Sequence, residues 1–184
     1  MDITEGVKIN RMTEQVAHKP IVFAVSGIKN SGKTTLIEKL VKSLTSYGYQ
    51  VGVIKHDGHE FIADHEGTDS FRHKKAGAKN VIVYSKTKFM MIEEKENSTL
   101  QELLALQKHM DIIILEGMKY SVFPKIEIVR AAVSSKSVCN PETLLALVTD
   151  TPLSLPNIKR IELDDFNGIL ECVMAYIDAE TNKV

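Results

Sequence analysis

The residues best suited to chemistry lie in the octapeptide 27–34, GIKNSGKT. It has the pattern G-x-x-x-x-G-K-[ST] of a phosphate-binding P-loop. The glycines at positions 27 and 32 let the backbone turn tightly and approach phosphate oxygens, so that successive N–H groups surround the anion. Lys33 supplies a full positive charge to the β- and γ-phosphates, and the Thr34 hydroxyl is suited to ligate Mg²⁺. The octapeptide therefore predicts nucleotide binding.

The segments on either side of the octapeptide are those that a P-loop needs. Residues 20–26 (PIVFAVS) form an apolar, β-rich run that is typical of a buried strand. The apolar residues that follow recur at helical spacing: Leu36, Ile37, Leu40, Val41, Leu44 and Tyr47. Strand, loop and helix in this order favour a phosphate site over the alternative, a glycine-rich turn that binds nothing.

A site for a magnesium nucleotide also needs an acid at the end of a strand near the P-loop. The apolar run 111–116 begins with Asp111 and ends with Glu116, about 16 Å apart at roughly 3.3 Å per residue. Since ligands bind beyond the carboxyl ends of such strands, we assign Glu116 to the metal site. A glutamate is less usual than an aspartate at this position, so Glu116 has an alternative role in orienting a water molecule.

Asp57 follows the strand expected at 51–55 and so faces the same sheet edge. It could hold Mg²⁺ or contact a substrate, or be an ordinary loop aspartate. Glu116 and Asp57 are the candidate catalytic residues, and with Thr34 they are the candidate metal ligands.

Recognition of the base has the weakest signal in the sequence. The motif Asn/Thr-Lys-x-Asp, with which common GTPases read guanine, is absent. Asp150 ends the buried strand expected at 144–148 and is the nearest analogue by position, with turn formation before Pro152 as the alternative.

The histidines at positions 56, 59 and 65 lie among acidic residues and suggest either a metal site or, as we favour, a loop that closes over a substrate or partner. Arginines are scarce and do not cluster as in the lid of a metabolite kinase.

Strands alternate with helices along the chain, which predicts an α/β sheet with helices on both faces. Residues 81–84 and 89–92 read as a β-hairpin, which an all-parallel sheet would not contain. The run 125–130 (KIEIVR) alternates with period two, so we expect one solvent-facing side. Residues 1–19 are polar and aperiodic and read as a disordered extension, followed by a single nucleotide-binding domain over 20–184.

Composition excludes several classes of protein. The 184 residues are 43% hydrophobic with a net charge of −1, which is unlike the basic footprint of a nucleic-acid-binding protein. The two cysteines lie far apart and read as reduced thiols. No apolar run approaches a membrane span and no signal peptide begins the chain, so we expect a soluble, cytoplasmic protein.

Taken in order, several motifs resemble the MobB family of accessory proteins in molybdopterin-guanine dinucleotide biosynthesis. They are G-x-x-x-S-G-K-T-T at 27–35, I-K-H at 54–56, G-x-D-S at 67–70, K-A-G-A at 75–78, D-x-I-x-x-E-G-x-K at 111–119 and T-D-x-P-L at 149–153. The P-loop alone is shared by many NTPases, whereas this ordered series is much more specific. The resemblance spans about 20–178.

The resemblance implies a three-layer P-loop NTPase fold, a mostly parallel sheet with a β-hairpin extension, and binding of GTP with Mg²⁺ and weak hydrolysis at best. It also implies a homodimer joined through extended strands, and a partner nucleotidyltransferase, MobA, which attaches GMP to molybdopterin. By matching position, Glu116 would serve the metal, and the phosphates would contact Gly27, Asn30, Ser31, Gly32, Lys33, Thr34 and Thr35. The alternatives are a small-metabolite kinase using GTP or ATP, and an interaction module whose nucleotide site is structural.

Overall fold

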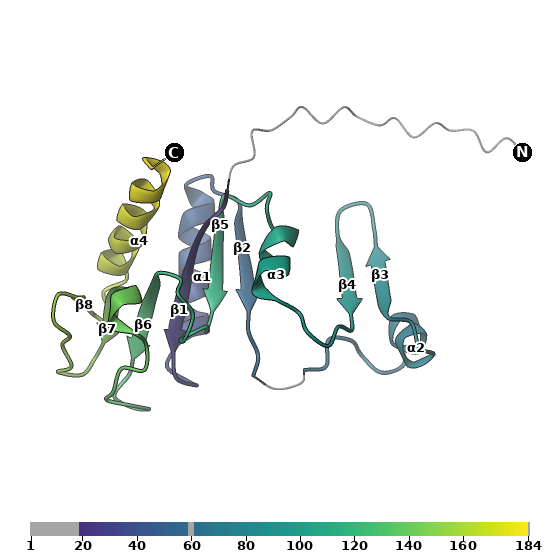
Figure 1. Ribbon diagram of the computed structural model, residues 1–184, viewed down its shortest axis with the longest axis horizontal. Helices are drawn as coiled ribbons and strands as arrows, with labels where there is room; N and C mark the ends of the chain where they lie inside the picture. The colour runs from purple at the N-terminus through teal and green to yellow at the C-terminus, as the bar shows by residue number, and fades with distance from the viewer. Residues whose placement is uncertain (1–18, 59–60, 184) are drawn as a thin grey trace, which may run out of the picture.

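The structure, a computed structural model, describes residues 19–58 and 61–183 (Figure 1). Apart from Lys19, the predicted N-terminal extension lies outside the described residues, as does the predicted His59 of the histidine-rich loop.

A six-stranded sheet forms the centre of the molecule, and its strand order is β2-β5-β1-β6-β7-β8. All neighbouring strands in this sheet run parallel. Their carboxyl ends therefore meet at one edge, where ligands bind in sheets of this kind. The strands are β1 (Ile21–Gly27), β2 (Val51–Lys55), β5 (Ile112–Glu116), β6 (Lys125–Val129), β7 (Leu144–Thr149) and β8 (Lys159–Glu162).

Helices cover both faces of this sheet, as predicted. Helices α1 (Lys33–Ser46) and α4 (Phe166–Thr181) bury their apolar sides against one face, in a core that includes Phe23, Leu40 and Val173. Helix α3 (Leu100–Leu106) packs on the other face, over β2 and β5. The result is the predicted three-layer arrangement, which fixes the P-loop between β1 and α1.

Capping residues that the sequence indicates define two of the helix starts. The Thr99 hydroxyl accepts a hydrogen bond from Glu102 N (3.3 Å) and the Glu102 carboxylate accepts one from Thr99 N (3.0 Å), which completes a capping box. The Asp165 carboxylate accepts one from Gly168 N (2.9 Å) at the start of α4. A 3₁₀ turn at Pro141–Thr143 precedes β7.

Strand β6 corrects one prediction. Its period-two alternation predicted a solvent-facing side, but all five residues are buried, because β6 lies between β1 and β7 and its charged side chains contact residues 121, 137–138 and 143. Glu127 accepts hydrogen bonds from Ser137 Oγ and Val138 N (both 2.6 Å). Lys125 Nζ donates hydrogen bonds to Ser121 O (2.6 Å) and to the Thr143 hydroxyl (2.9 Å). The charged side chains are thus buried with hydrogen-bond partners, and β6 is no free strand for pairing across a dimer.

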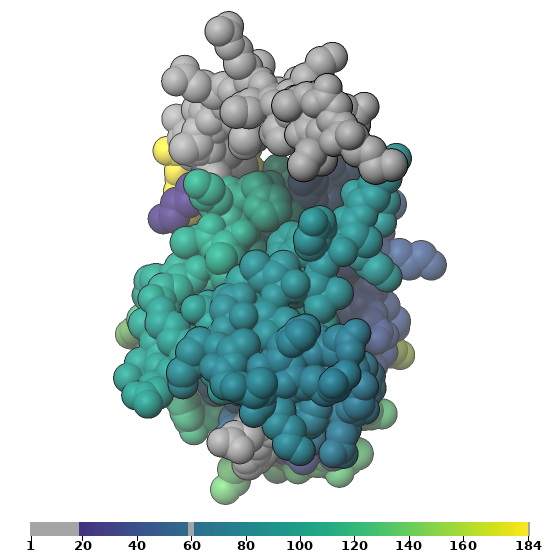
Figure 2. Space-filling view, turned by 90° about the vertical axis from the view of Figure 1, so that its right-hand side faces the viewer, coloured from purple at the N-terminus to yellow at the C-terminus, as the bar shows by residue number. Residues whose placement is uncertain are grey.

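The predicted hairpin is present, outside the main sheet. Strands β3 (Asn80–Tyr84) and β4 (Phe89–Glu93) pair antiparallel as a separate two-stranded sheet. Helix α2 (Asp69–Lys75) precedes the hairpin. Figure 1 shows this unit projecting beside the main sheet, and in Figure 2 it occupies the face toward the viewer.

Candidate functional site

The P-loop follows β1 directly, and its two glycines are required by the backbone. Gly27 has φ 140° and Gly32 has φ 102°, both in the region that L-residues rarely adopt. A Cβ at position 27 would lie 2.5 Å from Ile128 O on the neighbouring strand β6. Helix α1 begins at Lys33, so its N-terminal end and its free N–H groups face the loop. The loop therefore has the backbone geometry of an anion cradle.

The Lys33 side chain turns back over this loop. Its ammonium group donates hydrogen bonds to Ile28 O (2.7 Å) and Gly27 O (3.2 Å). Desolvation lowers the pKa of the Lys33 ammonium, and the Glu116 carboxylate opposes that shift. The loop carbonyls thus hold a partly desolvated charge at the mouth of the cradle, where it can meet phosphate oxygens.

Thr34 and Glu116 lie together, although 82 positions separate them in the sequence. Thr34 Oγ1 donates to Glu116 Oε1 at 2.9 Å. The contact follows from the fold, since Glu116 ends β5 and pairs in register with Val25 of β1, just before the P-loop. Asp111 lies at the opposite end of β5 and accepts a hydrogen bond from Gln50 N (2.7 Å). The structure therefore joins the P-loop hydroxyl to the acid that the sequence assigns to the metal.

A cleft of about 1150 Å³ opens in front of these residues, along the carboxyl edge of the sheet. Among the described residues that line it, the acidic side chains are those of Asp57 and Glu116. Its basic side chains are more numerous: Lys29, Lys33, Lys55, Lys119 and Arg130. An excess of cations in a concave site raises the local concentration of anions, so the cleft is suited to a polyphosphate.

The remaining predicted residues have different placements. Asp57 lines the cleft, as does His56. Asp150 is exposed and lines neither of the two cavities beside the P-loop; its carboxylate accepts a hydrogen bond from Ala131 N (2.6 Å). Within 19–58 and 61–183, no three His, Cys, Asp or Glu side chains gather in a way that would hold a metal ion. Base contact by Asp150 stays a prediction.

A second, smaller cavity of about 180 Å³ adjoins the cleft on its β6 and β7 side. Gly32, Thr35 and Arg130 line both cavities. Sequence reasoning missed Lys119 and Arg130 as site residues, although Arg130 directly follows β6 and the strand-end rule could have indicated it.

A comparison with models of known protein families shows to which family this chain belongs. Residues 22–150 match the model of MobB, molybdopterin guanine dinucleotide synthesis protein B. The chain belongs to the MobB family. The match includes the P-loop, Asp57 and Glu116, and it ends before β8 and α4.

Individual MobB relatives agree with this result. A protein of Haemophilus influenzae is 34% identical over 153 residues, which cover 79% of this chain and 86% of the relative. A protein of Escherichia coli is 29% identical over 170 residues, which cover 86% of this chain and 94% of the relative. Both are named molybdopterin-guanine dinucleotide biosynthesis adapter protein.

The crystal structure of Bacillus subtilis MobB superposes with a TM-score of 0.70 at 25% identity, covering 85% of this chain and 97% of that one. The mostly parallel α/β fold is thus shared with a solved MobB structure. In the part of the chain that is described, no helix has the length and apolar character needed to cross a membrane.

Proposed function

We propose that this protein is a GTP-binding adapter in molybdopterin-guanine dinucleotide biosynthesis, which assists a partner nucleotidyltransferase of the MobA type. The family and the names of its relatives support the pathway. The contact between Thr34 and Glu116, beside the Lys33 ammonium, carries the nucleotide part of the proposal. Three groups that a triphosphate and its metal need are already together.

The residues present fit a magnesium ion. Mg²⁺ prefers hard oxygen ligands, usually one or two carboxylates together with phosphates and water. The Thr34 hydroxyl and the Glu116 carboxylate lie 2.9 Å apart, and Asp57 lines the same cleft. When bound, the metal would neutralise charge on the β- and γ-phosphate oxygens. The chain's own contribution would be to hold and orient the nucleotide.

The same cleft disfavours the alternative of a metabolite kinase. Phosphoryl transfer develops charge on the transferred group, which such enzymes stabilise with several guanidinium groups. Among the described residues that line the cleft, Arg130 is the single arginine. We therefore expect weak GTP hydrolysis and no rapid transfer to a small acceptor.

The hairpin supports the proposal of a homodimer. Tyr84 and Phe89 face each other in the register of β3 and β4, and their exposed fractions are 82% and 74%. The adjacent Ile82 is 56% exposed. Exposed apolar side chains on a strand pair mark an interaction surface, and β3 and β4 have open edges that another strand can join. A second copy of the chain is the partner that we propose for this surface. Separately, the cytoplasmic location stays a prediction.

Calorimetric titration of purified protein with Mg·GTP and with Mg·ATP, followed by assay of released phosphate, tests the nucleotide proposal. We expect GTP to bind well ahead of ATP, with phosphate release below about one per minute. Equal or tighter ATP binding together with phosphate transfer at about 1 s⁻¹ or faster would overturn the proposal and favour a kinase.

A functional assay separates the adapter from a module whose nucleotide site is structural. Cofactor assembly by the partner nucleotidyltransferase should depend on the nucleotide site of this protein, so Lys33→Ala should slow it. Partner binding and assembly that Lys33→Ala leaves intact would show that the nucleotide site is structural.

A further inference from the structure

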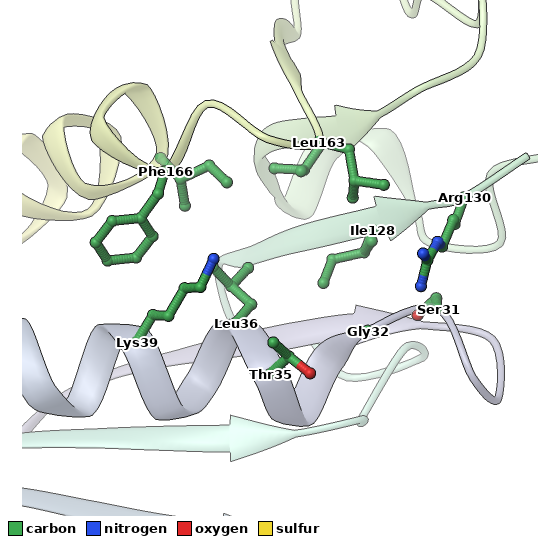
Figure 3. A pocket seen from close by; sticks show the side chains of 11 residues that line it. Ser31, Gly32, Thr35, Leu36, Lys39, Ile128, Arg130, Leu163 and Phe166 are labelled. Carbon is green, nitrogen blue, oxygen red and sulfur yellow. The ribbon is translucent and has the colours of Figure 1, made fainter.

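The small cavity beside the P-loop is formed by elements that are distant in the sequence. Its floor is apolar and comes from β6, β7, α1 and α4, with Ile128 and Val148 at the strand ends. Leu163 and Phe166 form a further apolar wall, and they lie beyond the span that matches the family model. Figure 3 shows Lys39 with Phe166 at one end of the cavity and Arg130 with Ser31 at the other.

The orientation of a bound nucleotide follows from the strand order. A magnesium ion held by Thr34 and Glu116 would neutralise the β- and γ-phosphates, so these phosphates would lie near Glu116 on β5, to one side of β1. The α-phosphate and the nucleoside must then extend to the other side of β1, where β6 and β7 lie. The small cavity occupies this side and shares Gly32, Thr35 and Arg130 with the phosphate cleft.

The size and the lining of the cavity suit a flat aromatic group. An apolar cavity of about 150 Å³ suffices to bind benzene, and this one of about 180 Å³ opens toward the cleft, which leaves room for a larger ring system and its ribose at the mouth. Apolar walls with few polar groups are the usual composition of a small-molecule site.

The polar groups at the cavity are mostly hydrogen-bond donors. Lys39 and Arg130 have N–H groups and no acceptor, and no described carboxylate lines the cavity. The Lys39 ammonium lies 5.7 Å from the centroid of the Phe166 ring. A purine that packs against Leu163 and Phe166 therefore meets a donor at its edge. Guanine presents two acceptors there, N7 and O6, whereas adenine presents N7 and an amino donor.

Ser31 gives independent support for a ligand at this place. Its hydroxyl is almost fully buried, lines the cavity and has no hydrogen-bond partner among the described residues. A buried polar atom without a partner costs free energy, so a native structure that keeps one calls for an explanation. A ligand oxygen on the path from the phosphates to the base would supply the missing partner.

We propose that this cavity is the nucleoside subsite and that Lys39 selects a 6-oxopurine over a 6-aminopurine, with Leu163 and Phe166 holding the ring. The inference rests on the proposed binding of GTP at the P-loop, which it deepens by naming the residues that read the base.

The test compares three ligands, each with Mg²⁺: GTP, ATP and inorganic tripolyphosphate. Lys39→Met keeps the length of the side chain and removes the donor, and Lys42→Met is the matched control on an exposed position of the same helix. We expect Lys39→Met to weaken GTP binding about tenfold, as for the loss of a base-specific contact. Affinities for ATP and tripolyphosphate should change less than twofold, and Lys42→Met should change none of the three.

A second variant fills the cavity. Leu163→Trp should weaken GTP and ATP binding at least tenfold and leave tripolyphosphate binding unchanged, which also shows that the P-loop has kept its fold. If neither Lys39→Met nor Leu163→Trp changes the GTP affinity while Lys33→Ala abolishes it, the subsite is wrong and the proposed function stands. If Lys33→Ala leaves the affinities for all three ligands unchanged, the proposed function fails, and the subsite with it.

Discussion

Strand β6 and the β3–β4 hairpin have sequence patterns and environments that run opposite to each other. Strand β6 (KIEIV) contains two charged residues and is entirely buried. The hairpin strands NVIVY and FMMIE are largely apolar, yet most of their side chains are exposed. The charged side chains of β6 are hydrogen-bonded within the chain, whereas the described residues leave most of the apolar hairpin side chains uncovered. The proposed nucleotide cleft is lined by residues of one molecule, whereas the hairpin presents an apolar surface that a second molecule can cover.

The largest effect in this comparison is expected where β6 buries its charge. Glu127→Ala would leave Ser137 Oγ and Val138 N without this acceptor, and would remove the carboxylate that interacts with the buried Lys125 ammonium. We expect a loss of about 2–4 kcal/mol in the free energy of unfolding, measured by urea denaturation. Glu127→Gln keeps an acceptor and should lose less. A change in the free energy of unfolding below about 0.5 kcal/mol for Glu127→Ala would show that the buried Glu127 and Lys125 contribute little to stability.

In the hairpin, adding charge rather than removing it should have a large effect, and the effect should be on dimerisation. Tyr84→Asp with Phe89→Asp places two charges on the proposed interface and should raise the dimer dissociation constant about 100-fold, because a buried unpaired charge is costly. Sedimentation velocity measures it, and Lys86→Asp in the turn between the strands is the control. Monomeric protein should keep its GTP affinity. Unchanged sedimentation of the double variant would contradict a dimer built through the hairpin.

The nucleotide edge predicts a smaller, metal-specific effect. Glu116→Gln should weaken GTP binding about tenfold when Mg²⁺ is present, since a carboxylate ligand loses its charge. The affinity measured with EDTA should change less than twofold. Asp111→Asn, at the other end of the same strand, should leave the Mg²⁺ dependence intact. Equal losses with and without Mg²⁺ would assign Glu116 a role other than the metal site.

The smallest expected effect concerns acid stability near the hairpin exit. Hydrogen bonds from Lys95 and Thr99 lower the pKa of Glu102 from 4.5 to about 2. Because the folded-state pKa is the lower one, the carboxylate stabilises the fold fully above pH 4.5, and this contribution disappears as the pH falls toward 2. Glu102→Gln should lower the melting temperature slightly at pH 7 and not at pH 2. An equal decrease at both pH values would exclude the ionised cap.

Local patterns in the sequence predicted the elements whose signals are local. The P-loop, the hairpin and the strand-end position of Glu116 were predicted, because each depends on a few adjacent residues. The burial of β6 was predicted wrongly, since its alternation separates two buried faces that differ in polarity.

The small cavity had no sequence signal. Lys39 and Phe166 meet there across 127 positions, and only the packing of α4 beside α1 brings them together.

The P-loop residues at the carboxyl edge of the sheet, Lys33 above all, are proposed to bind the magnesium nucleotide. Calorimetric titration of Mg·GTP into the wild type and Lys33→Ala, with thermal melts of both, tests this claim most directly. Removing the ammonium from the cradle should weaken binding about 100-fold, or about 2.7 kcal/mol, because charge-assisted hydrogen bonds to phosphate are lost. The melting temperature should not fall. An unchanged GTP affinity in a folded Lys33→Ala protein would contradict the claim and locate the nucleotide elsewhere.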